Sequence, residues 1–202
     1  MKLMQQSNGN RRTAKGWPLP IALWLMTLST AYAQTAVETW VQRYGSLADA
    51  RDTAIAAVAD GTGNVIVAGV SQGLSGAQFL IIKYSGEGVP LWTNRYNGPG
   101  NSYDEAKVVT VDGSGNVFVT GASGLESSPD YVTVAYSASG APLWTNRYDG
   151  PPTTYGNSYD EAEAIAVDAG GNVIVTGTSS GDCVTVKYSG EGAPLWTNRY
   201  DG

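Results

Sequence analysis

The side chains best suited to chemistry in this sequence are carboxylates that recur at corresponding positions along the chain. Asp104-Glu105 and Asp160-Glu161 are two such pairs, and Asp52 stands at the equivalent position before them. The chain has no histidine, so it has no Ser-His-Asp or Cys-His arrangement and no imidazole ligand for a metal. Carboxylate oxygens bind Ca²⁺ or a cationic partner, which makes these five residues the candidate ligand-binding residues. We expect no catalytic residue, and no metal or cofactor unless these acids bind Ca²⁺.

Three alternatives to ligand binding remain open for these acids. Each aspartate could fasten its own loop, or it could pair with a repeat arginine such as Arg95 or Arg147. A carboxylate-based hydrolase needs one acid in an apolar pocket and another in water, an asymmetry that near-identical repeated loops do not favour. A second acidic series, at Asp60, Asp112 and Asp168, begins Asp-x-x-Gly-Asn. It lacks the ligand pattern of an EF-hand and predicts tight turns.

The elements that position these acids come from an internal repeat. Leu-Trp-Thr-Asn-Arg-Tyr occurs three times and a looser copy lies upstream, so that four tryptophans follow one another at steps of 52 residues: Trp40, Trp92, Trp144 and Trp196. Three tyrosines keep the same spacing: Tyr84, Tyr136 and Tyr188. A fixed period of this size indicates one supersecondary unit that is stacked repeatedly, and these aromatic residues are its structural landmarks.

Each repeat unit predicts four short antiparallel strands and no helix. In the middle unit, β-branched runs alternate with turn clusters, and a polar loop is expected at 121–130. Pro90, Pro142 and Pro194 open the fourth strand and mark it as a sheet edge, because proline lacks an amide donor. The expected fold is all-β, a β-propeller of four-stranded antiparallel blades, with blades at 52–96, 104–148 and 160–200 and a lone outer strand at 38–44.

The number of units predicts an incomplete, open propeller. Residues 34–202 hold about three blades and one extra N-terminal edge strand, whereas propellers close with about four to eight blades. Three blades leave unpaired strand edges and exposed apolar faces. We therefore expect either a fragment of a longer propeller or the association of two or more copies, blade against blade.

The segments Asp160–Gly177 and Val184–Trp196 carry Asp-Glu-Ala, Gly-Asn-Val, Thr-Gly, Tyr-Ser-Gly and Pro-Leu-Trp in that order. This pattern resembles the bacterial SBBP-type β-propeller repeat, and the resemblance extends over residues 38–202. It implies secreted or surface proteins with no shared catalytic residues. Gly-x-Pro-Leu-Trp-Thr is also similar, more weakly, to the tryptophan-docking repeats of quinoprotein propellers. Lys-Tyr-Ser stands where those repeats hold Ala-Leu-Asp, so no quinone cofactor is implied.

Residues 1–33 have the features of a secretory signal peptide. Basic residues precede an apolar run, Trp17–Leu28, and Ala31-Tyr32-Ala33 supplies the small residues needed for cleavage before Gln34. A membrane anchor is the alternative, but the apolar run is shorter than the roughly 20 residues that a spanning helix needs. We expect an exported protein, extracellular, periplasmic or at the cell surface, with no membrane span after cleavage.

Cleavage at this site would make the protein strongly acidic. The four basic residues of the signal leave and no acid does, so 8 of the 12 Lys and Arg remain against 18 Asp and Glu, a net charge of −10. Nucleic acid and anionic lipid require basic surfaces, so neither is an expected partner. Cys183, the single cysteine, aligns with Phe79 and Tyr131. We expect it to be a small buried residue and not a reactive thiol.

The expected function is non-enzymatic binding by a secreted or surface scaffold. A protein or other ligand would bind the segments that differ between units: Gln72–Gln78, Gly124–Asp130 and Ser179–Asp182. Trp92, Asn94 and Tyr96 share one face of a strand, which either packs blade on blade or forms a repeated glycan site. A multivalent lectin is therefore the first alternative, and a fragment of a carboxylate-based hydrolase is the second.

Overall fold

The fold is built from antiparallel β-strands. The computed structural model describes residues 38–45, 51–73, 76–99, 103–152, 156 and 158–201, and the expected signal peptide lies outside these residues. Over these ranges there is no helix, and so none long and apolar enough to cross a membrane. The same ranges hold twelve strands: β1 (Asp52–Ala59), β2 (Val65–Gly73), β3 (Gly76–Tyr84), β4 (Pro90–Tyr96), β5 (Tyr103–Val111), β6 (Val117–Leu125), β7 (Ser128–Tyr136), β8 (Pro142–Tyr148), β9 (Asp160–Val167), β10 (Val173–Ser179), β11 (Asp182–Tyr188) and β12 (Pro194–Tyr200).

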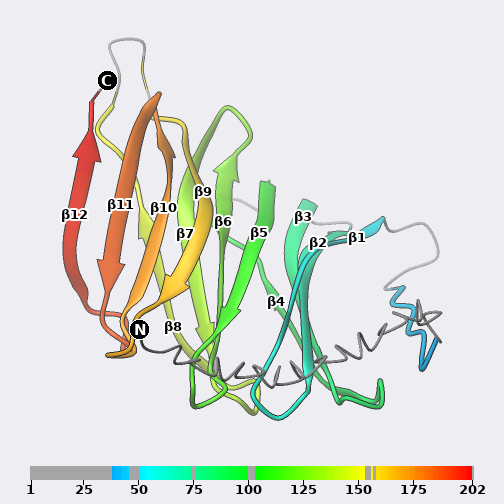
Figure 1. Cartoon of the computed structure of the whole chain (residues 1–202). Helices are drawn as coiled ribbons and strands as arrows, with labels where there is room; N and C mark the ends of the chain where they lie inside the picture. The colour runs from blue at the N-terminus through cyan, green and yellow to red at the C-terminus, as the bar shows by residue number, and fades with distance from the viewer. Residues whose placement is uncertain are drawn as a thin grey trace, which may run out of the picture. The chain divides into compact units, whose positions relative to one another are not determined.

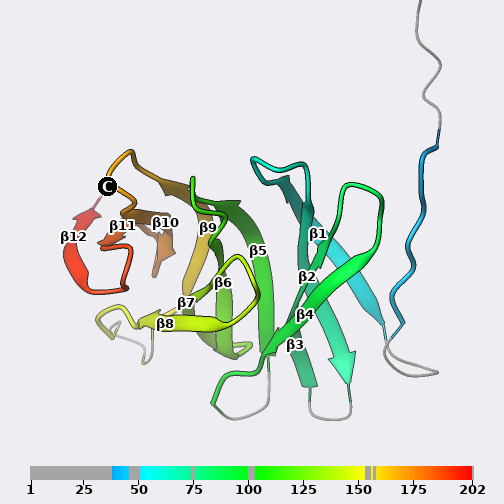
Figure 2. The ribbon, with the colours of Figure 1, turned by 90° about the horizontal axis from the view of Figure 1, so that it is seen from below.

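The strands form three four-stranded sheets, one for each repeat unit (Figure 1). Strand order within each sheet follows the chain, β1 to β4, β5 to β8 and β9 to β12, and we call these sheets 1, 2 and 3. The first strand of each sheet contacts the first strand of the next, β1 with β5 and β5 with β9. Figure 2 shows the sheets side by side, without closure into a barrel. The predicted all-β class and the predicted four-stranded antiparallel sheets are confirmed.

Turns stabilised by side chains connect the first two strands of each sheet. Oδ1 of Asp60 accepts hydrogen bonds from the amides of Thr62 and Asn64, at 2.9 and 3.0 Å. Gly63 supplies the positive φ of 82° that this turn requires. Equivalent turns follow β5 and β9, where Asp112 and Asp168 accept the corresponding amide hydrogen bonds. The second acidic series therefore forms turns, as predicted.

Apolar side chains between neighbouring sheets form the core. One cluster joins sheet 1 to sheet 2 and includes Phe79 and Val132, and another joins sheet 2 to sheet 3 and includes Phe118 and Val184. All four of these side chains are buried. Removing apolar surface from water stabilises a protein by about 25 cal/mol per Å². Each sheet consequently depends on its neighbour to bury one of its faces.

A tryptophan on the fourth strand anchors each of these interfaces. Nε1 of Trp92 in β4 donates to the carbonyl of Ala138 at 3.1 Å, and Nε1 of Trp144 in β8 donates to the carbonyl of Gly190 at 2.9 Å. Both carbonyls lie in the turn between the third and fourth strands of the following sheet. The tryptophan of one sheet thus docks on the next sheet, 46 residues further along the chain.

Each docked indole lies against a glycine of that turn. A Cβ atom at Gly140 would lie 2.7 Å from Cγ of Trp92, and a Cβ atom at Gly192 would lie 2.6 Å from Cγ of Trp144. Both glycines also have a positive φ of 86°, which residues other than glycine rarely adopt. Glycine is required at these positions for two reasons: the backbone has a positive φ, and a Cβ atom would collide with the indole ring.

The lone outer strand predicted at 38–44 is not a strand. Residues 38–45 form no strand, yet Trp40 docks on sheet 1 as the other two tryptophans dock on their sheets, with Nε1 3.1 Å from the carbonyl of Gly86. The segment copies only a fourth strand, and a fourth strand needs a third strand to supply its backbone hydrogen bonds. Side-chain docking therefore occurs here without strand pairing.

The segments predicted as variable loops are mostly strand. The polar loop expected at 121–130 instead lengthens β6 and β7 to nine residues each, so that only residues 126–127 connect them. β10 and β11 have seven residues each. The units therefore differ in the length of a hairpin and not in the length of its loop, because backbone pairing continues past the serine and glycine turn signals.

Cys183 is exposed, contrary to the prediction that it is buried. Its counterparts Phe79 and Tyr131 are buried because the following sheet covers each of them. Cys183 lies on the face of sheet 3 that none of the other described sheets covers. Position within the repeat fixes the direction of this side chain, and the neighbouring sheet decides its exposure.

The docking of tryptophan on glycine predicts a large difference between two alanine substitutions. Gly171→Ala removes a glycine with a φ of 77° and open space around it, so it should cost about 1–2 kcal/mol for the left-handed backbone. Gly140→Ala has the same backbone cost and in addition pushes a Cβ into Trp92, so it should cost about 1–3 kcal/mol more. Urea unfolding followed by tryptophan fluorescence measures both losses. Equal losses would show that the indole contact does not constrain Gly140.

Candidate functional site

The two ends of each sheet differ in how closely the three units repeat. At one end lie the turns 60–64 and 85–89 and their equivalents, which are nearly the same in all units, and we call this the repeated edge. At the other end lie the hairpin ends of β2–β3, β6–β7 and β10–β11 and the connections between sheets, and we call this the variable edge. In Figure 1 the variable edge is uppermost for sheets 2 and 3.

A pocket opens at the variable edge between sheet 2 and the connection that leads into sheet 3. It has a volume of about 440 Å³ and lies between the end of the β6–β7 hairpin and the connection from β8 to β9. The hydroxyl of Ser128 donates to the carbonyl of Ser158 at 2.9 Å and so ties the hairpin to the connection. The lining residues come from segments in which the units differ: Leu125, Ser128, Asp130, Asp149, Gly150, Pro152 and Ser158.

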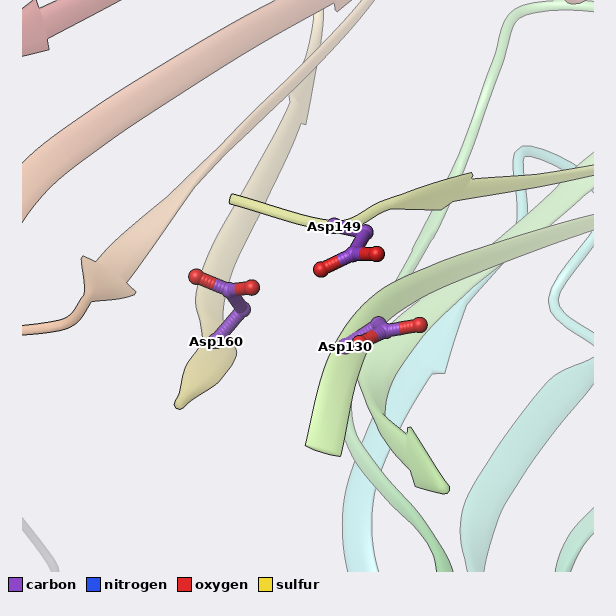
Figure 3. Close-up of side chains that lie close together, drawn as sticks. All are labelled: Asp130, Asp149 and Asp160. Atoms are coloured by element: carbon purple, nitrogen blue, oxygen red, sulfur yellow. The ribbon is translucent and has the colours of Figure 1, made fainter. Parts of the chain in front are cut away.

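Three carboxylates converge beside this pocket (Figure 3). Asp130 lies in β7, Asp149 follows β8 and Asp160 begins β9, and one oxygen atom from each lies within 4.8 Å of the others. Oxygen atoms at this spacing can share a hard cation or a basic group of a ligand. The cluster already holds internal partners, since Nη2 of Arg147 lies 2.7 Å from Asp130 Oδ2. The hydroxyl of Ser158 lies 3.1 Å from Asp149 and 2.7 Å from Asp160.

The pKa of Asp130 reflects its burial first and the neighbouring acids second. Burial raises the pKa of the Asp130 carboxyl above its ordinary value, and the negative charges of Asp149 and Asp160 raise it further. Arg147 acts in the opposite direction and does not cancel the rise. The cluster is therefore a place where additional positive charge is electrostatically favourable.

Asp104 and Asp160, two of the predicted ligand-binding residues, are fully buried. Oδ2 of Asp104 accepts a hydrogen bond from the amide of Gly98 at 2.8 Å, and Oδ2 of Asp160 accepts one from the amide of Gly150 at 2.7 Å. Each aspartate thus fastens the connection that leads into its own strand, which is one of the alternatives that the sequence left open. Among the described atoms, Oδ1 of each carboxylate has no hydrogen-bond partner.

Glu105 and Glu161 point to the other side of the same strands, as the alternation of side chains requires. Nζ of Lys107 lies 3.3 Å from Glu105 and 2.9 Å from Glu161, and so joins β5 to β9. Tyr103 donates a hydrogen bond to Glu105, and Tyr159 donates one to Glu161. Burial acts to lower the pKa of Lys107, but the two glutamates outweigh it and raise that pKa.

The five predicted ligand-binding residues therefore do not converge on one site. Asp104 and Asp160 are buried at the start of their strands, whereas Glu105 and Glu161 both pair with Lys107 between sheets 2 and 3. Asp52 lies opposite Ser71 in sheet 1 and lines a different cavity, under Trp40. The structure brings Asp160 together with Asp130 and Asp149, which the sequence did not single out as acids. Asp130 does fall within the variable segment 124–130, and this divergence between units was the available signal.

Two of the three acidic turns at the repeated edge pair with lysines. Nζ of Lys83 lies 2.9 Å from Asp60, and Nζ of Lys187 lies 2.8 Å from Asp168. Burial acts to raise the pKa of Asp60, but hydrogen bonds from Asn64, Lys83 and other groups outweigh it and hold that pKa well below its ordinary value. In sheet 2 the lysine position is Ala135, so Asp112 provides a natural comparison.

These ion pairs predict how stability depends on pH. A lowered carboxyl pKa contributes stability above about pH 4, and this contribution is lost as the pH falls through the lowered pKa. Asp60→Asn should therefore cost about 2–3 kcal/mol at pH 7 and should unfold with less dependence on pH below pH 5 than the parent protein. Asp112→Asn is the matched control and should cost less, because Ala135 stands at the position of the lysine. Urea midpoints between pH 3 and pH 7 measure both effects, and identical pH profiles for the two variants would contradict the assignment.

Comparison with known proteins adds little to this site. No protein-family model matches the sequence, and no curated protein matches it. Among solved structures, the chain is similar to one described as "Crystal structure of the eukaryotic initiation factor", with 10% sequence identity and a TM-score of 0.49. The match covers 79% of this chain and 35% of that chain, so this chain spans about a third of the other. A likeness at this level carries no information on function.

Proposed function

We propose that this chain is an exported, non-enzymatic binding scaffold, built of propeller-type blades like those of the SBBP-type repeat, that binds its ligand at the variable edge. One observation carries the proposal. Three sheets with nearly the same framework differ at one edge, and at that edge the β6–β7 hairpin and the connection from β8 to β9 enclose a pocket. Variation confined to connections on a fixed framework is typical of ligand-binding surfaces.

The repeated edge supports the proposal by contrast. Its turns receive the tryptophans of neighbouring sheets, and two of its aspartates pair with lysines. A substitution there would disturb the packing of one sheet on the next. The variable edge lies at the opposite ends of the strands, so its hairpins change in length without moving the docked tryptophans.

The chemistry of the pocket favours a ligand that is basic and partly apolar. Asp130, Asp149 and Asp160 provide negative charge, and the side chain of Leu125 at the rim is 60% exposed. Residues 34–202 carry a net charge of −10, which attracts cationic partners and repels nucleic acid. A basic peptide segment with an apolar side chain fits both features.

The lectin alternative has less support than the sequence suggested. A repeated glycan site would need the tryptophan and asparagine side chains of the fourth strands at the surface. In β4, Trp92 donates to Ala138 and Asn94 donates to the carbonyl of Gly140 at 2.7 Å. In β8, the side chain of Asn146 donates to Gly192 in the same way. These groups hold neighbouring sheets together.

The proposal predicts that binding depends on the variable edge alone. Residues 34–202 would be screened against immobilised basic, neutral and acidic peptides and against a glycan array. Binding to basic peptides should fall at least tenfold, about 1.4 kcal/mol, in the double variant Leu125→Ser and Asp149→Asn. The control Val89→Ser and Glu87→Gln changes one exposed apolar residue and one exposed acid at the repeated edge and should bind like the parent. Equal losses in both variants, or retention of glycans and not of basic peptides, would reject the proposal.

A further inference from the structure

Three copies of one heptapeptide have different surroundings in this structure. β4, β8 and β12 all read Pro-Leu-Trp-Thr-Asn-Arg-Tyr. In β4 and β8 the Trp, Asn and Tyr side chains, which share one face, are half-buried against the following sheet. In β12 the same face is exposed, with Trp196 at 41% and Tyr200 at 73%. β4 and β8 thus pack this face, which we call the docking face, against the following sheet, whereas β12 exposes the same face.

The interactions made by this face are known from the two copies within the chain. Trp92 donates to Ala138, Asn94 donates to Gly140, and the hydroxyl of Tyr96 accepts from Nη1 of Arg147 at 3.4 Å. The ring of Trp92 also packs against Tyr136, with centroids 6.1 Å apart. These contacts lie on the face of sheet 2 that packs against sheet 1, which we call the receiving face. A sheet with an equivalent receiving face could therefore bind β12 in the same way.

Sheet 1 has an equivalent receiving face. Leu80, Ile82 and Tyr84 on β3 form a buried apolar group, and Ile82 and Tyr84 occupy the positions that Val134 and Tyr136 occupy on β7. Residues 38–45, which we call the cap, cover this surface. Two of its residues, Trp40 and Tyr44, contact sheet 1 as the equivalent residues of a fourth strand contact the following sheet.

The cap reproduces the tryptophan and tyrosine contacts of the docking face. Nε1 of Trp40 lies 3.1 Å from the carbonyl of Gly86, and its ring lies 5.8 Å from that of Tyr84. Nη2 of Arg95 donates to the hydroxyl of Tyr44 at 2.8 Å, as Arg147 donates to Tyr96 in the next sheet. The cap and a β12 strand therefore compete for the same groups on sheet 1.

The cap nevertheless fills the site incompletely. It forms no strand and brings no sheet behind it. A cavity of about 300 Å³ remains between the cap and sheet 1, lined largely by apolar groups that include Val67, Leu80 and Ile82. In sheets 2 and 3 the equivalent face is covered by a whole sheet, and Val119 and Val175 are fully buried there, whereas the corresponding Val67 of sheet 1 is half-buried under the cap. A complete sheet would bury more apolar surface here than the cap does.

We propose that sheet 1 is a docking site for the β12 face of a second copy of this chain, and that the cap limits this head-to-tail association by occupying the site. The contact joins two different surfaces, so it is heterologous and can add copies in sequence. It extends to two molecules the interface that already joins sheet 1 to sheet 2 and sheet 2 to sheet 3. Trp196 is the anchor of the incoming copy, since buried tryptophans dominate such contacts.

Substitution of the two competing tryptophans tests this proposal by sedimentation velocity on residues 34–202. Trp40→Ala frees the site and should convert a mostly monomeric protein into larger species at the same concentration. Trp40→Ala combined with Trp196→Ala frees the site but removes the anchor, and should return the protein to a monomer. Val41→Ala, an exposed position of the cap, is the control and should leave the parent distribution unchanged.

A mixing experiment distinguishes specific docking from adhesion of an exposed apolar sheet. The double variant has a free site and no anchor, whereas the parent has an anchor and a capped site, so an equal mixture should give a 1:1 complex and nothing larger. Larger species in the double variant alone would overturn the proposal, because they would form without Trp196. So would Trp40→Ala remaining monomeric with cooperative urea unfolding, or a mixture showing no complex.

Discussion

The docking of each fourth-strand tryptophan on the following sheet is the interaction on which the rest of this structure depends. A four-stranded sheet cannot bury both of its faces alone, and here the apolar faces between sheets 1 and 2 and between sheets 2 and 3 cover one another. The hydrogen bond from the indole to a turn carbonyl contributes only about 1 kcal/mol, but it sets the relative position of two sheets. The glycine against the ring allows this approach, since a Cβ at Gly140 would lie 2.7 Å from Trp92.

This constraint divides the molecule into parts with different freedom. Turns that receive a tryptophan must keep their glycine, their carbonyl and their length, so the repeated edge is nearly the same in each unit. The opposite ends of the strands carry no such contact. There the β6–β7 hairpin extends further than the β10–β11 hairpin, and the longer connection into sheet 3 lies against it through Ser128 and Ser158. The pocket arises where this longer connection meets the β6–β7 hairpin.

The acids show how the same residue types take different roles within one strand. The Asp160 side chain is buried and accepts a hydrogen bond from the amide of Gly150. Glu161, one position later, lies on the other side of the strand and pairs with Lys107 of the neighbouring sheet. The alternation of a strand separates them. Asp130 comes from the preceding sheet and Asp149 from the connection that follows it, so the acidic cluster exists only because these segments meet at the start of sheet 3. Internal partners such as Arg147 partly compensate its charge, which leaves it able to attract a cationic group.

Much of this architecture could be predicted from the sequence alone, because repetition makes local signals cumulative. The period, the turn glycines and the proline before each fourth strand determined the number of strands, their order and their antiparallel pairing. The divergence of 124–130 also pointed to the region of the pocket.

The sequence could not decide which faces are covered: Trp92 and Trp196 stand in identical heptapeptides, and so differ only in whether a sheet lies against them. Tertiary structure decided that Cys183 is exposed, that Trp40 docks without a strand, and that Asp130, Asp149 and Asp160 meet. The physical reason is common to all three, since burial and the proximity of charges are properties of the contact between sheets, and a repeat encodes each sheet but not its neighbours.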